Sequence, residues 1–147
     1  GARVMDLQEP SNKMSKSADA AAGTILVLDD PAVIIKKVKR AVTDTESEVR
    51  YDVAAKPGVS NLLSILAACT GRTPEEAAVG YTQYGPLKAD TAEAVVELLR
   101  PIQARYHELE DDPGAMVEIL AKGAGKAQAV SSVVLDRAKR NVGLLPR

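Results

Sequence analysis

The sequence predicts a mainly α-helical fold in which a helical bundle follows an extended loop. Three observations support this prediction. Apolar residues recur at helical spacing through most of the chain after residue 29. Several of these runs begin with a capping residue followed by proline. Phe and Trp are absent and only four Tyr are present, so the core must be built from Leu, Ile, Val and Ala, which favours helices packed through small side chains.

The first 23 residues have no strong hydrophobic period, and turn-forming residues such as Pro10 and Gly23 predict a loop. Val4 and Met5 are apolar and predict at most the end of a strand. Residues 24–28 are β-branched or apolar and predict a brief extended segment. The amino-terminal part is therefore expected to carry little regular structure.

A first helix is expected over residues 31–42, with Asp30 as its cap and Pro31 at its first position. Ile34, Ile35, Val38 and Val42 follow at helical spacing. The polar residues 43–58 predict a connector that ends in a Pro-Gly turn.

Two shorter helices are expected next. Ser60 or Asn61 is the predicted cap of the first, and Gly71 is its predicted end. Residues 73–76, with the sequence TPEE, form a capping box that starts a short helix ending near Gly80.

Two long helices complete a bundle of about five, over residues 86–110 and 113–141. Pro101 lies inside the first and predicts a kink. Asp112 is the predicted cap of the second, which Gly123 and Gly125 weaken at its middle. The apolar stripes of the two helices comprise Val95, Leu98, Leu99, Ile102, Tyr106 and Leu109, and Met116, Val117, Ile119, Leu120, Ala127, Val130, Val133 and Val134.

Composition excludes several classes of protein. The chain has 147 residues, which suits one compact domain with a sizeable core, and its net charge of −1 means that any basic function must be local. Cys69 is the single cysteine; it lies in an apolar run, predicts a buried inert thiol and fits a reducing compartment. A single histidine, His107, excludes a multi-histidine metal site. No run approaches the ~20 apolar residues of a membrane span, and the first residue is Gly rather than Met, so we expect a piece of a longer protein or a processed product.

The most informative stretch is Lys13, Met14, Ser15, Lys16 and Ser17, here called the signature loop. Two lysines three positions apart, with hydroxyl groups between and after them, form a small phosphate trap. Lysine is a point charge on a flexible stem, so it can follow a phosphate group as charge moves during a reaction. On chemistry alone a solvated basic loop explains the same residues, because short motifs often match by chance.

The literal string KMSKS resembles the signature of the class I aminoacyl-tRNA synthetases. Further blocks in the same order resemble bacterial tryptophanyl-tRNA synthetases, and together they cover essentially the whole chain. These blocks are GARVM at residues 1–5, LDDP at 28–31, AVTDTE at 41–46, KPG at 56–58 with NLL at 61–63, and LRPIQ at 99–103 with RY at 105–106.

The resemblance implies a mechanism. Tryptophan and ATP form an enzyme-bound adenylate, pyrophosphate leaves, and the amino acid then passes to its tRNA. It implies that Lys13 and Lys16 are catalytic residues that stabilise the departing pyrophosphate together with Mg²⁺. It further implies that Ser15, Ser17 and the backbone at Met14 and Lys16 contact ATP phosphates or ribose. By the same resemblance the main chain of Val4 contacts adenine.

The resemblance also implies which parts are missing. Class I catalysis needs a Rossmann domain and an amino-acid pocket, and the sequence has no such βαβ pattern. We therefore expect residues 1–28 to form the end of a catalytic domain and residues 29–147 to form a helical domain of the anticodon-binding type. The expected partners are ATP and tRNA(Trp), with tryptophan bound by the absent domain. The intact enzyme is expected to be a cytoplasmic homodimer without a membrane segment, and the 147 residues alone are expected to be inactive.

Two alternative functions remain open. A tyrosyl-tRNA synthetase shares the signature loop, although the later blocks resemble it less. A non-catalytic helical RNA-binding or adaptor module would explain the helices without catalysis. An upstream Rossmann domain in the parent reading frame would favour an enzyme, and its absence would favour the module.

Other polar clusters have simpler explanations than a site. Lys36, Lys37, Lys39 and Arg40 read as a solvated face, with tRNA phosphate contact as the alternative. Asp44, Glu46, Glu48 and Asp52 surround Arg50, and a connector neutralised by Arg50 is simpler than a metal or acid–base site. Tyr106 lies on an apolar stripe, which favours a core position over stacking on unpaired bases beside Arg100 and Arg105, and His107 is expected to be exposed.

Overall fold

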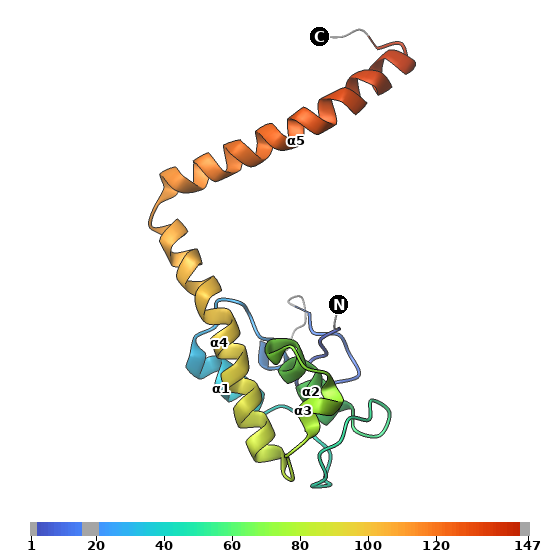
Figure 1. Cartoon of the computed structure of the whole chain (residues 1–147), viewed down its shortest axis with the longest axis vertical. Helices are drawn as coiled ribbons and strands as arrows, with labels where there is room; N and C mark the ends of the chain where they lie inside the picture. Colours follow the sequence, from blue (N-terminus) through green and yellow to red (C-terminus); the bar gives the residue numbers. More distant parts are fainter. Residues whose placement is uncertain (1–2, 16–20, 145–147) are drawn as a thin grey trace. The chain divides into compact units, whose positions relative to one another are not determined.

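The computed structural model describes residues 3–15 and 21–144, so Lys16 and Ser17 of the signature loop lie outside the described residues. The elements within those ranges are a 3-10 helix, η1 (Ala21–Gly23), and five α-helices (Figure 1). The mainly helical fold predicted from the sequence is confirmed. The chain divides into two compact units, Gly1–Gln103 and Ala104–Arg147, and the boundary falls within helix α4.

The core of the first unit is aliphatic, as the composition requires. It is formed where the apolar sides of α1 (Pro31–Lys39), α2 (Pro57–Thr70) and α4 (Tyr84–Glu110) face inward. Its fully buried members, none more than 2% exposed, are Leu7, Ile34, Val38, Val59, Leu62, Leu63, Leu66, Ala77, Leu87 and Ala92. Leu7 belongs to the amino-terminal segment, so this segment is anchored in the core rather than lying on its surface.

Helix α1 begins at Pro31 as predicted but ends at Lys39, three residues before the predicted end at Val42. The helical spacing of Val42 was therefore misleading. Its backbone N–H donates to the Leu7 carbonyl at 2.8 Å, and its side chain is 45% exposed. A tertiary backbone contact thus takes the residue that the hydrophobic period assigned to the helix.

Helix α2 begins at Pro57, and neither Ser60 nor Asn61 is its cap, which corrects the predicted start. Both residues lie inside the helix and are buried. Gly58, assigned to a turn by the sequence, stands in the first helical turn, where a Cβ atom would lie 2.1 Å from the Val42 carbonyl oxygen. The glycine is therefore needed for close approach of two backbones. The end at Gly71 is confirmed, since this residue is left-handed with φ 69°.

Helices α3 (Pro74–Ala78) and α4 form close to where the sequence predicts them, whereas the extended segment predicted before α1 does not form. Helix α3 carries both reciprocal bonds of the predicted capping box between Thr73 and Glu76. Helix α4 begins at Tyr84, two residues before the predicted start, and contains Pro101 as predicted. The extended segment predicted at residues 24–28 is not a strand; the Asp29 N–H turns back to the Leu26 carbonyl at 3.0 Å.

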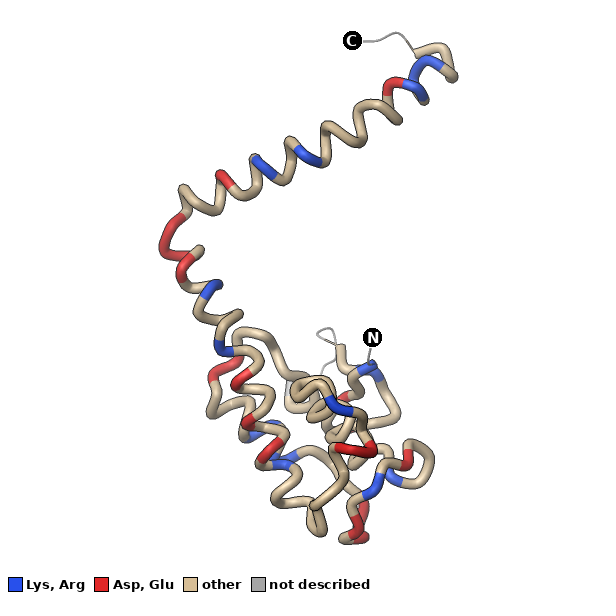
Figure 2. Tube along the Cα trace, in the orientation of Figure 1, with Lys and Arg blue, Asp and Glu red and all other residues tan. Residues whose placement is uncertain are grey.

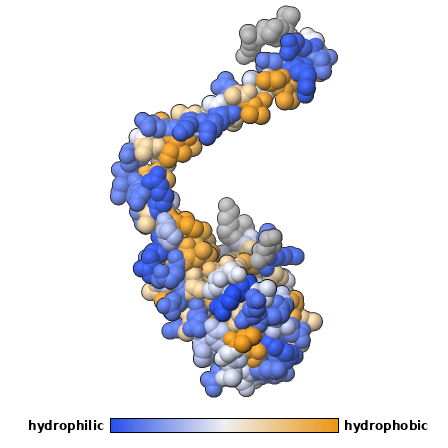
Figure 3. All heavy atoms as spheres, in the orientation of Figure 1, coloured by the Kyte–Doolittle hydropathy of each residue, from blue (hydrophilic) through white to orange (hydrophobic). Residues whose placement is uncertain are grey.

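The second unit contains the end of α4 and helix α5 (Pro113–Asn141). Asp112 caps α5 as predicted, because its carboxylate accepts from the Ala115 N–H at 3.0 Å. The apolar stripe of α5 is not covered by any described residue of its unit, and none of its residues is buried. Figure 3 shows apolar atoms along the surface of this helix. Tyr106 is 43% exposed, so the prediction of a core position was wrong: a helical stripe becomes core only where another element packs on it.

Candidate functional site

The signature loop leaves from a short two-stranded hairpin. Met5 and Lys13 form an isolated antiparallel bridge. The Met14 N–H donates to the Val4 carbonyl at 3.1 Å, and the Asp6 N–H donates to the Asn12 carbonyl at 2.8 Å. Lys13 is therefore held on a paired strand while its neighbours continue into the loop, and the prediction that Val4 and Met5 end a strand is realised as this single bridge.

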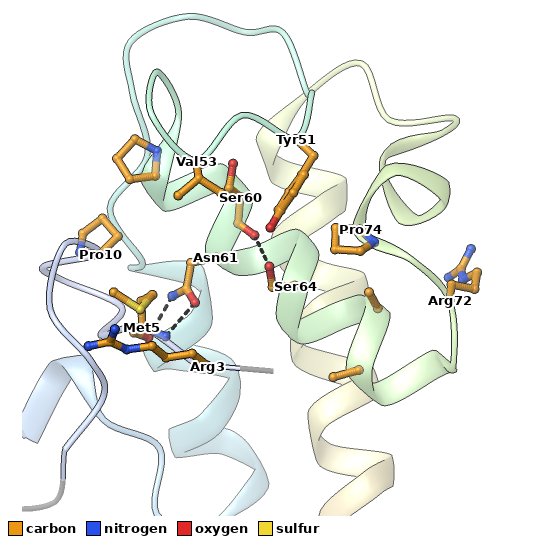
Figure 4. A pocket seen from close by; sticks show the side chains of 13 residues that line it. Arg3, Met5, Pro10, Tyr51, Val53, Ser60, Asn61, Ser64, Arg72 and Pro74 are labelled. Atoms are coloured by element: carbon orange, nitrogen blue, oxygen red, sulfur yellow. Dashed lines mark hydrogen bonds between the residues drawn. The ribbon is translucent and has the colours of Figure 1, made fainter. Parts of the chain in front are cut away.

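Helix α2 holds the outer side of this hairpin. The Met5 N–H donates to Asn61 Oδ1 at 2.9 Å, and Asn61 Nδ2 donates to the Met5 carbonyl at 2.8 Å (Figure 4). Asn61 is only 4% exposed. The strand that faces Lys13 is thus fastened to the core by a side chain far from it in sequence.

The turn that closes the hairpin is organised by Asp6, which is 7% exposed. Its Oδ1 accepts from the backbone N–H groups of Gln8 at 2.7 Å and Glu9 at 3.0 Å. Gly23 lies directly against it, because a Cβ atom at Gly23 would be 1.9 Å from Asp6 Oδ1. The segment that follows the loop is thus packed against the segment that precedes it.

Both ends of the loop are fixed to each other. The Leu7 N–H donates to the Gly23 carbonyl at 2.9 Å, and Thr24 Oγ1 donates to the Ser15 carbonyl at 3.1 Å. Thr24 itself is buried. The described residues on the two sides of the loop are thus joined by hydrogen bonds.

The residues predicted for ATP binding are placed as follows. Lys13 and Ser15 are exposed, and Val4 and Met14 are half-buried. The Val4 carbonyl already accepts from Met14, and a carbonyl oxygen has a second lone pair for a further donor. Lys16 and Ser17 are outside the described residues, so the structure brings together four of the six predicted residues.

A cavity of about 530 Å³ lies next to the hairpin, bordered by Met5 and Pro10 on one side and by α2 on the other (Figure 4). Arg3 and Arg72 are its charged lining residues, and no carboxylate lines it among the described residues. Ser64 also lines it, but its hydroxyl is used within α2, where it donates to the Ser60 carbonyl at 2.8 Å.

The comparisons with known proteins identify the family. The family model described as tRNA synthetases class I (W and Y) matches residues 2–100, which include the hairpin, the signature loop and helices α1 to α3. The chain belongs to this family. It is the family that the KMSKS string and the later sequence blocks predicted.

Individual relatives agree with this assignment. The tryptophan–tRNA ligase 1 of Streptomyces coelicolor is 54% identical over 145 residues, which are 99% of this chain and 43% of that protein. The tryptophan–tRNA ligase of Mycobacterium leprae is 48% identical and is likewise covered over 43% of its length. The chain therefore spans less than half of the curated relatives it matches.

Solved structures agree as well. The tryptophanyl-tRNA synthetase of Mycoplasma pneumoniae superposes with a TM-score of 0.87 at 30% identity, over 97% of this chain and 44% of that one. The Campylobacter jejuni tryptophanyl-tRNA synthetase complexed with ADP and tryptophan gives a TM-score of 0.67 at 25% identity, again over 97% and 44%. The helical architecture is thus that of the tryptophanyl members of the synthetase family.

Sequence reasoning about this synthetase chain missed a buried cation. Lys56 is 1% exposed, and its ammonium group lies 3.0 Å from Asp44 Oδ1, 2.7 Å from Glu46 Oε2 and 3.1 Å from the Tyr84 hydroxyl. Burial opposes its charge, but the hydrogen bonds that it donates to Glu46, Tyr84 and Asp44 outweigh this effect and raise the pKa of Lys56. A lysine at a helix start carries no sequence signal that it will be buried.

The acidic connector is consequently divided between two cations. Arg50 pairs with Glu46, Glu48 and Asp52, as the simpler explanation of this cluster predicted. Asp44 instead pairs with Lys56, which corrects its assignment to Arg50. Among the described residues no group of His, Cys, Asp and Glu is arranged to hold a metal ion.

The basic face of α1 is mostly solvated, as expected. Lys36, Lys39 and Arg40 are exposed. Figure 2 marks the Lys and Arg positions of the described residues in blue along the chain trace. Lys37 differs, because its ammonium group is bound to Asp29 Oδ2 at 2.6 Å and to the Thr24 carbonyl at 2.7 Å. It therefore ties α1 to the segment that follows the signature loop and is not part of the free basic surface.

The remaining candidates have local roles. Arg100 pairs with Glu97 and Arg105 with Glu108, each within one turn of α4. His107 is exposed as predicted, with Nδ1 3.3 Å from Glu110 Oε2. Cys69 is half-buried rather than fully buried, and this burial raises the pKa of its thiol, which disfavours the reactive thiolate. None of the helices in the described ranges has the length and apolar character needed to cross a bilayer.

Proposed function

We propose that this chain supplies the signature loop and the helical tRNA-binding part of a tryptophan–tRNA ligase. The observation that carries the proposal is the family match over residues 2–100, which contains the hairpin that presents Lys13. The names of the relatives favour tryptophan over tyrosine as the amino acid. The Rossmann domain and the amino-acid pocket belong to the part of such an enzyme that this chain does not span.

In the proposed reaction the carboxylate of tryptophan attacks the α-phosphorus of ATP, and the bond from that phosphorus to the β-phosphate oxygen breaks. Negative charge then grows on the departing pyrophosphate. Lys13 and Lys16 stabilise this charge, which raises the rate because the interaction is stronger in the transition state than in the ground state. Ser15 and Ser17, with the main chain of Val4 and Met14, hold the nucleotide.

Mg²⁺ enters this reaction with ATP as part of the substrate. The signature loop contains lysines and hydroxyl groups but no carboxylate. It therefore fits the phosphate groups, and the ion is held mainly by ATP oxygens and water, as Mg²⁺ commonly is in nucleotide sites. The described part of the chain contributes charge to the phosphates rather than ligands to the metal.

We propose that the boundary between the two functions lies after residue 28. Residues 1–28 complete the catalytic domain, and residues 29–147 form the domain that contacts tRNA(Trp). The exposed cations Lys36, Lys39 and Arg40 of α1 support a local phosphate contact despite the net charge of −1. The intact enzyme is proposed to be cytoplasmic, in keeping with a tRNA substrate and a single free cysteine. It is also proposed to be a homodimer, as the family resemblance implies.

A chimera tests the catalytic part of the proposal. This chain replaces the matching 145 residues of the Streptomyces coelicolor ligase, and tryptophan-dependent ATP–pyrophosphate exchange is measured. We expect an active chimera in which Lys13→Ala lowers kcat about 10²–10³-fold with little change in the KM for tryptophan, which is the range found when one transition-state donor is lost. Lys122→Ala, which changes an exposed lysine on α5 outside the basic face of α1, is the matched control and should retain activity. Equal losses in kcat and tryptophan binding would remove Lys13 from the transition-state role.

The tRNA part is tested with the 147-residue chain alone. We expect it to bind tRNA(Trp) better than tRNA(Tyr), and to lose affinity when the anticodon stem is deleted. Equal binding to all three RNAs would favour the non-specific RNA-binding module, and no binding to any would leave the helices as a scaffold. The chain alone is expected to give no pyrophosphate exchange.

A further inference from the structure

The Met5–Lys13 bridge leaves one side of Met5 unpaired by the hairpin. Successive peptide groups of an extended strand point to opposite sides. The hairpin uses the Val4 carbonyl and the Asp6 N–H, which flank Met5. The N–H and C=O of Met5 itself therefore point away from Lys13 and need partners elsewhere.

Asn61 supplies both partners at once. Its side-chain oxygen accepts from the Met5 N–H at 2.9 Å, and its side-chain nitrogen donates to the Met5 carbonyl at 2.8 Å. A side-chain amide combines one acceptor and a donor group in one plane, so it can pair with both groups of a single residue as a neighbouring strand would. In Figure 4 both bonds run from Asn61 to the backbone of Met5.

The part of α2 that carries Asn61 is fixed in the packed core. The neighbours of Asn61 in α2, Leu62 and Leu63, are 0% exposed, so the position of Asn61 is set by the packed core. The order of contacts therefore runs from the core through Asn61 to Met5, and across the bridge to Lys13. A positioned group loses much of its effect when its support is loosened.

We propose that Asn61 is a positioning residue of the adenylate-forming reaction, which fixes the strand of Met5 and thereby the place from which Lys13 reaches the phosphates. This inference rests on the proposed function. Asn61 touches neither ATP nor the reacting atoms in this role; it acts through Met5.

Hydrogen exchange in the 147-residue chain tests the positioning directly. The reporter is the Met14 N–H, which bonds to Val4 across the hairpin and not to Asn61. We expect Asn61→Ala and Asn61→Asp to speed exchange at Met14 about tenfold or more, since local opening of the hairpin becomes easier. Asp has the size of Asn but cannot donate to the Met5 carbonyl when ionised, so this variant separates the lost bond from lost packing.

The matched control is Ser64→Ala. Ser64 stands one turn further along α2 and lines the same cavity, but its hydroxyl bonds only within the helix. Exchange at Met14 in this variant should equal that of the unmodified chain. Acceleration as large as in Asn61→Ala would show that any change in this part of α2 loosens the hairpin, and would overturn the specific role of Asn61.

The same variants in the chimera test the consequence for catalysis. We expect both Asn61 variants to lower kcat of pyrophosphate exchange about tenfold or more, with the KM for tryptophan within about twofold, because misplacing a catalytic group costs rate rather than remote binding. Faster hydrogen exchange at Met14 with an unchanged kcat of pyrophosphate exchange would overturn the inference. Unchanged hydrogen exchange at Met14 would overturn it as well. Collapse of both variants, detected by far-UV circular dichroism, would make Asn61 a stability residue and overturn it too. An inactive unmodified chimera would instead refute the proposed function, and hydrogen exchange would still decide whether Asn61 holds the hairpin.

Discussion

Replacement of Gly58 by Ala tests how the start of α2 fits against the chain before it. A Cβ atom at this position would stand 2.1 Å from the Val42 carbonyl oxygen, about 0.9 Å short of the closest separation of 3.0 Å that real Cβ atoms tolerate. The obstacle is backbone, which cannot rotate away as a side chain can. Either the first turn of α2 or the segment around Val42 must move.

The expected cost can be estimated from three contributions. Overpacking of a buried site costs about 1–3 kcal/mol. Movement of Val42 weakens its 2.8 Å hydrogen bond to the Leu7 carbonyl, which contributes about 1 kcal/mol. The better helix propensity of Ala offsets up to about 1 kcal/mol of this destabilisation. The free energy of unfolding should therefore fall by about 2 kcal/mol, which lowers the Tm of a unit of this size by about 8–16 °C.

Gly85→Ala is the matched control. Gly85 is the second residue of α4 as Gly58 is the second residue of α2, but it is exposed and a Cβ atom there meets nothing within 4 Å. This variant should be unchanged or up to about 1 kcal/mol more stable. Tyrosine fluorescence during thermal unfolding reports mainly on the first unit, which contains three of the four tyrosines, Tyr51, Tyr81 and Tyr84. A Gly58→Ala melt within about 2 °C of the unmodified chain would refute the close-approach reasoning.

Three further predictions concern charged and titrating groups of the first unit. Lys56→Met should lower the Tm far more than Lys39→Met, because only Lys56 is buried against acidic partners; equal shifts would contradict this. Burial opposes the ionisation of Asp44, but hydrogen bonds from a tyrosine hydroxyl and from Lys56 outweigh this effect and lower the pKa of Asp44 below its ordinary 3.8. The stabilisation that ionised Asp44 contributes is therefore complete above pH 3.8 and is lost as the pH falls through the lowered pKa. Asp44→Asn should reduce this loss of stability at acid pH in pH-dependent melts. Burial and the bond to Asp90 raise the pKa of Tyr81 to about 12, so in a spectrophotometric titration Asp90→Asn should bring this tyrosine's ionisation to lower pH, and an unshifted curve would exclude the bond.

Most of the helical architecture could be predicted because its signals are local. The capping box at Thr73 and the cap at Asp112 depend on residues within one turn, and the structure bears out both. Helix α1 also begins at Pro31 as predicted, although the Asp30 side chain makes no cap hydrogen bond. The left-handed end of α2 at Gly71 is equally local. The signature loop was found as a string of chemistry-bearing residues, which needs no knowledge of the fold.

The errors arose where a tertiary contact overrides the local pattern. Val42 fits the period of α1 but gives its N–H to Leu7, 35 positions earlier in the printed sequence. Lys56 carries the most hydrophilic kind of side chain, yet three oxygen atoms from other segments make its burial possible. The prediction for Tyr106 was wrong in the opposite sense: an expected core residue is exposed, since no described residue of its unit covers its apolar stripe.

The start of α2 joins these errors to the site. Gly58 lets the helix approach Val42, whose N–H binds Leu7, and Asn61, one turn later, binds Met5. The first turn of α2 thus fixes two residues of the segment that precedes the signature loop. It holds Met5 directly through Asn61, and it holds Leu7 indirectly through Val42. Sequence reading assigned the glycine to a turn and the asparagine to a helix cap, because Gly and Asn have those local meanings. Their tertiary meaning differs: the glycine permits a backbone contact and the asparagine replaces a neighbouring strand, so the place of Lys13 depends on how α2 begins.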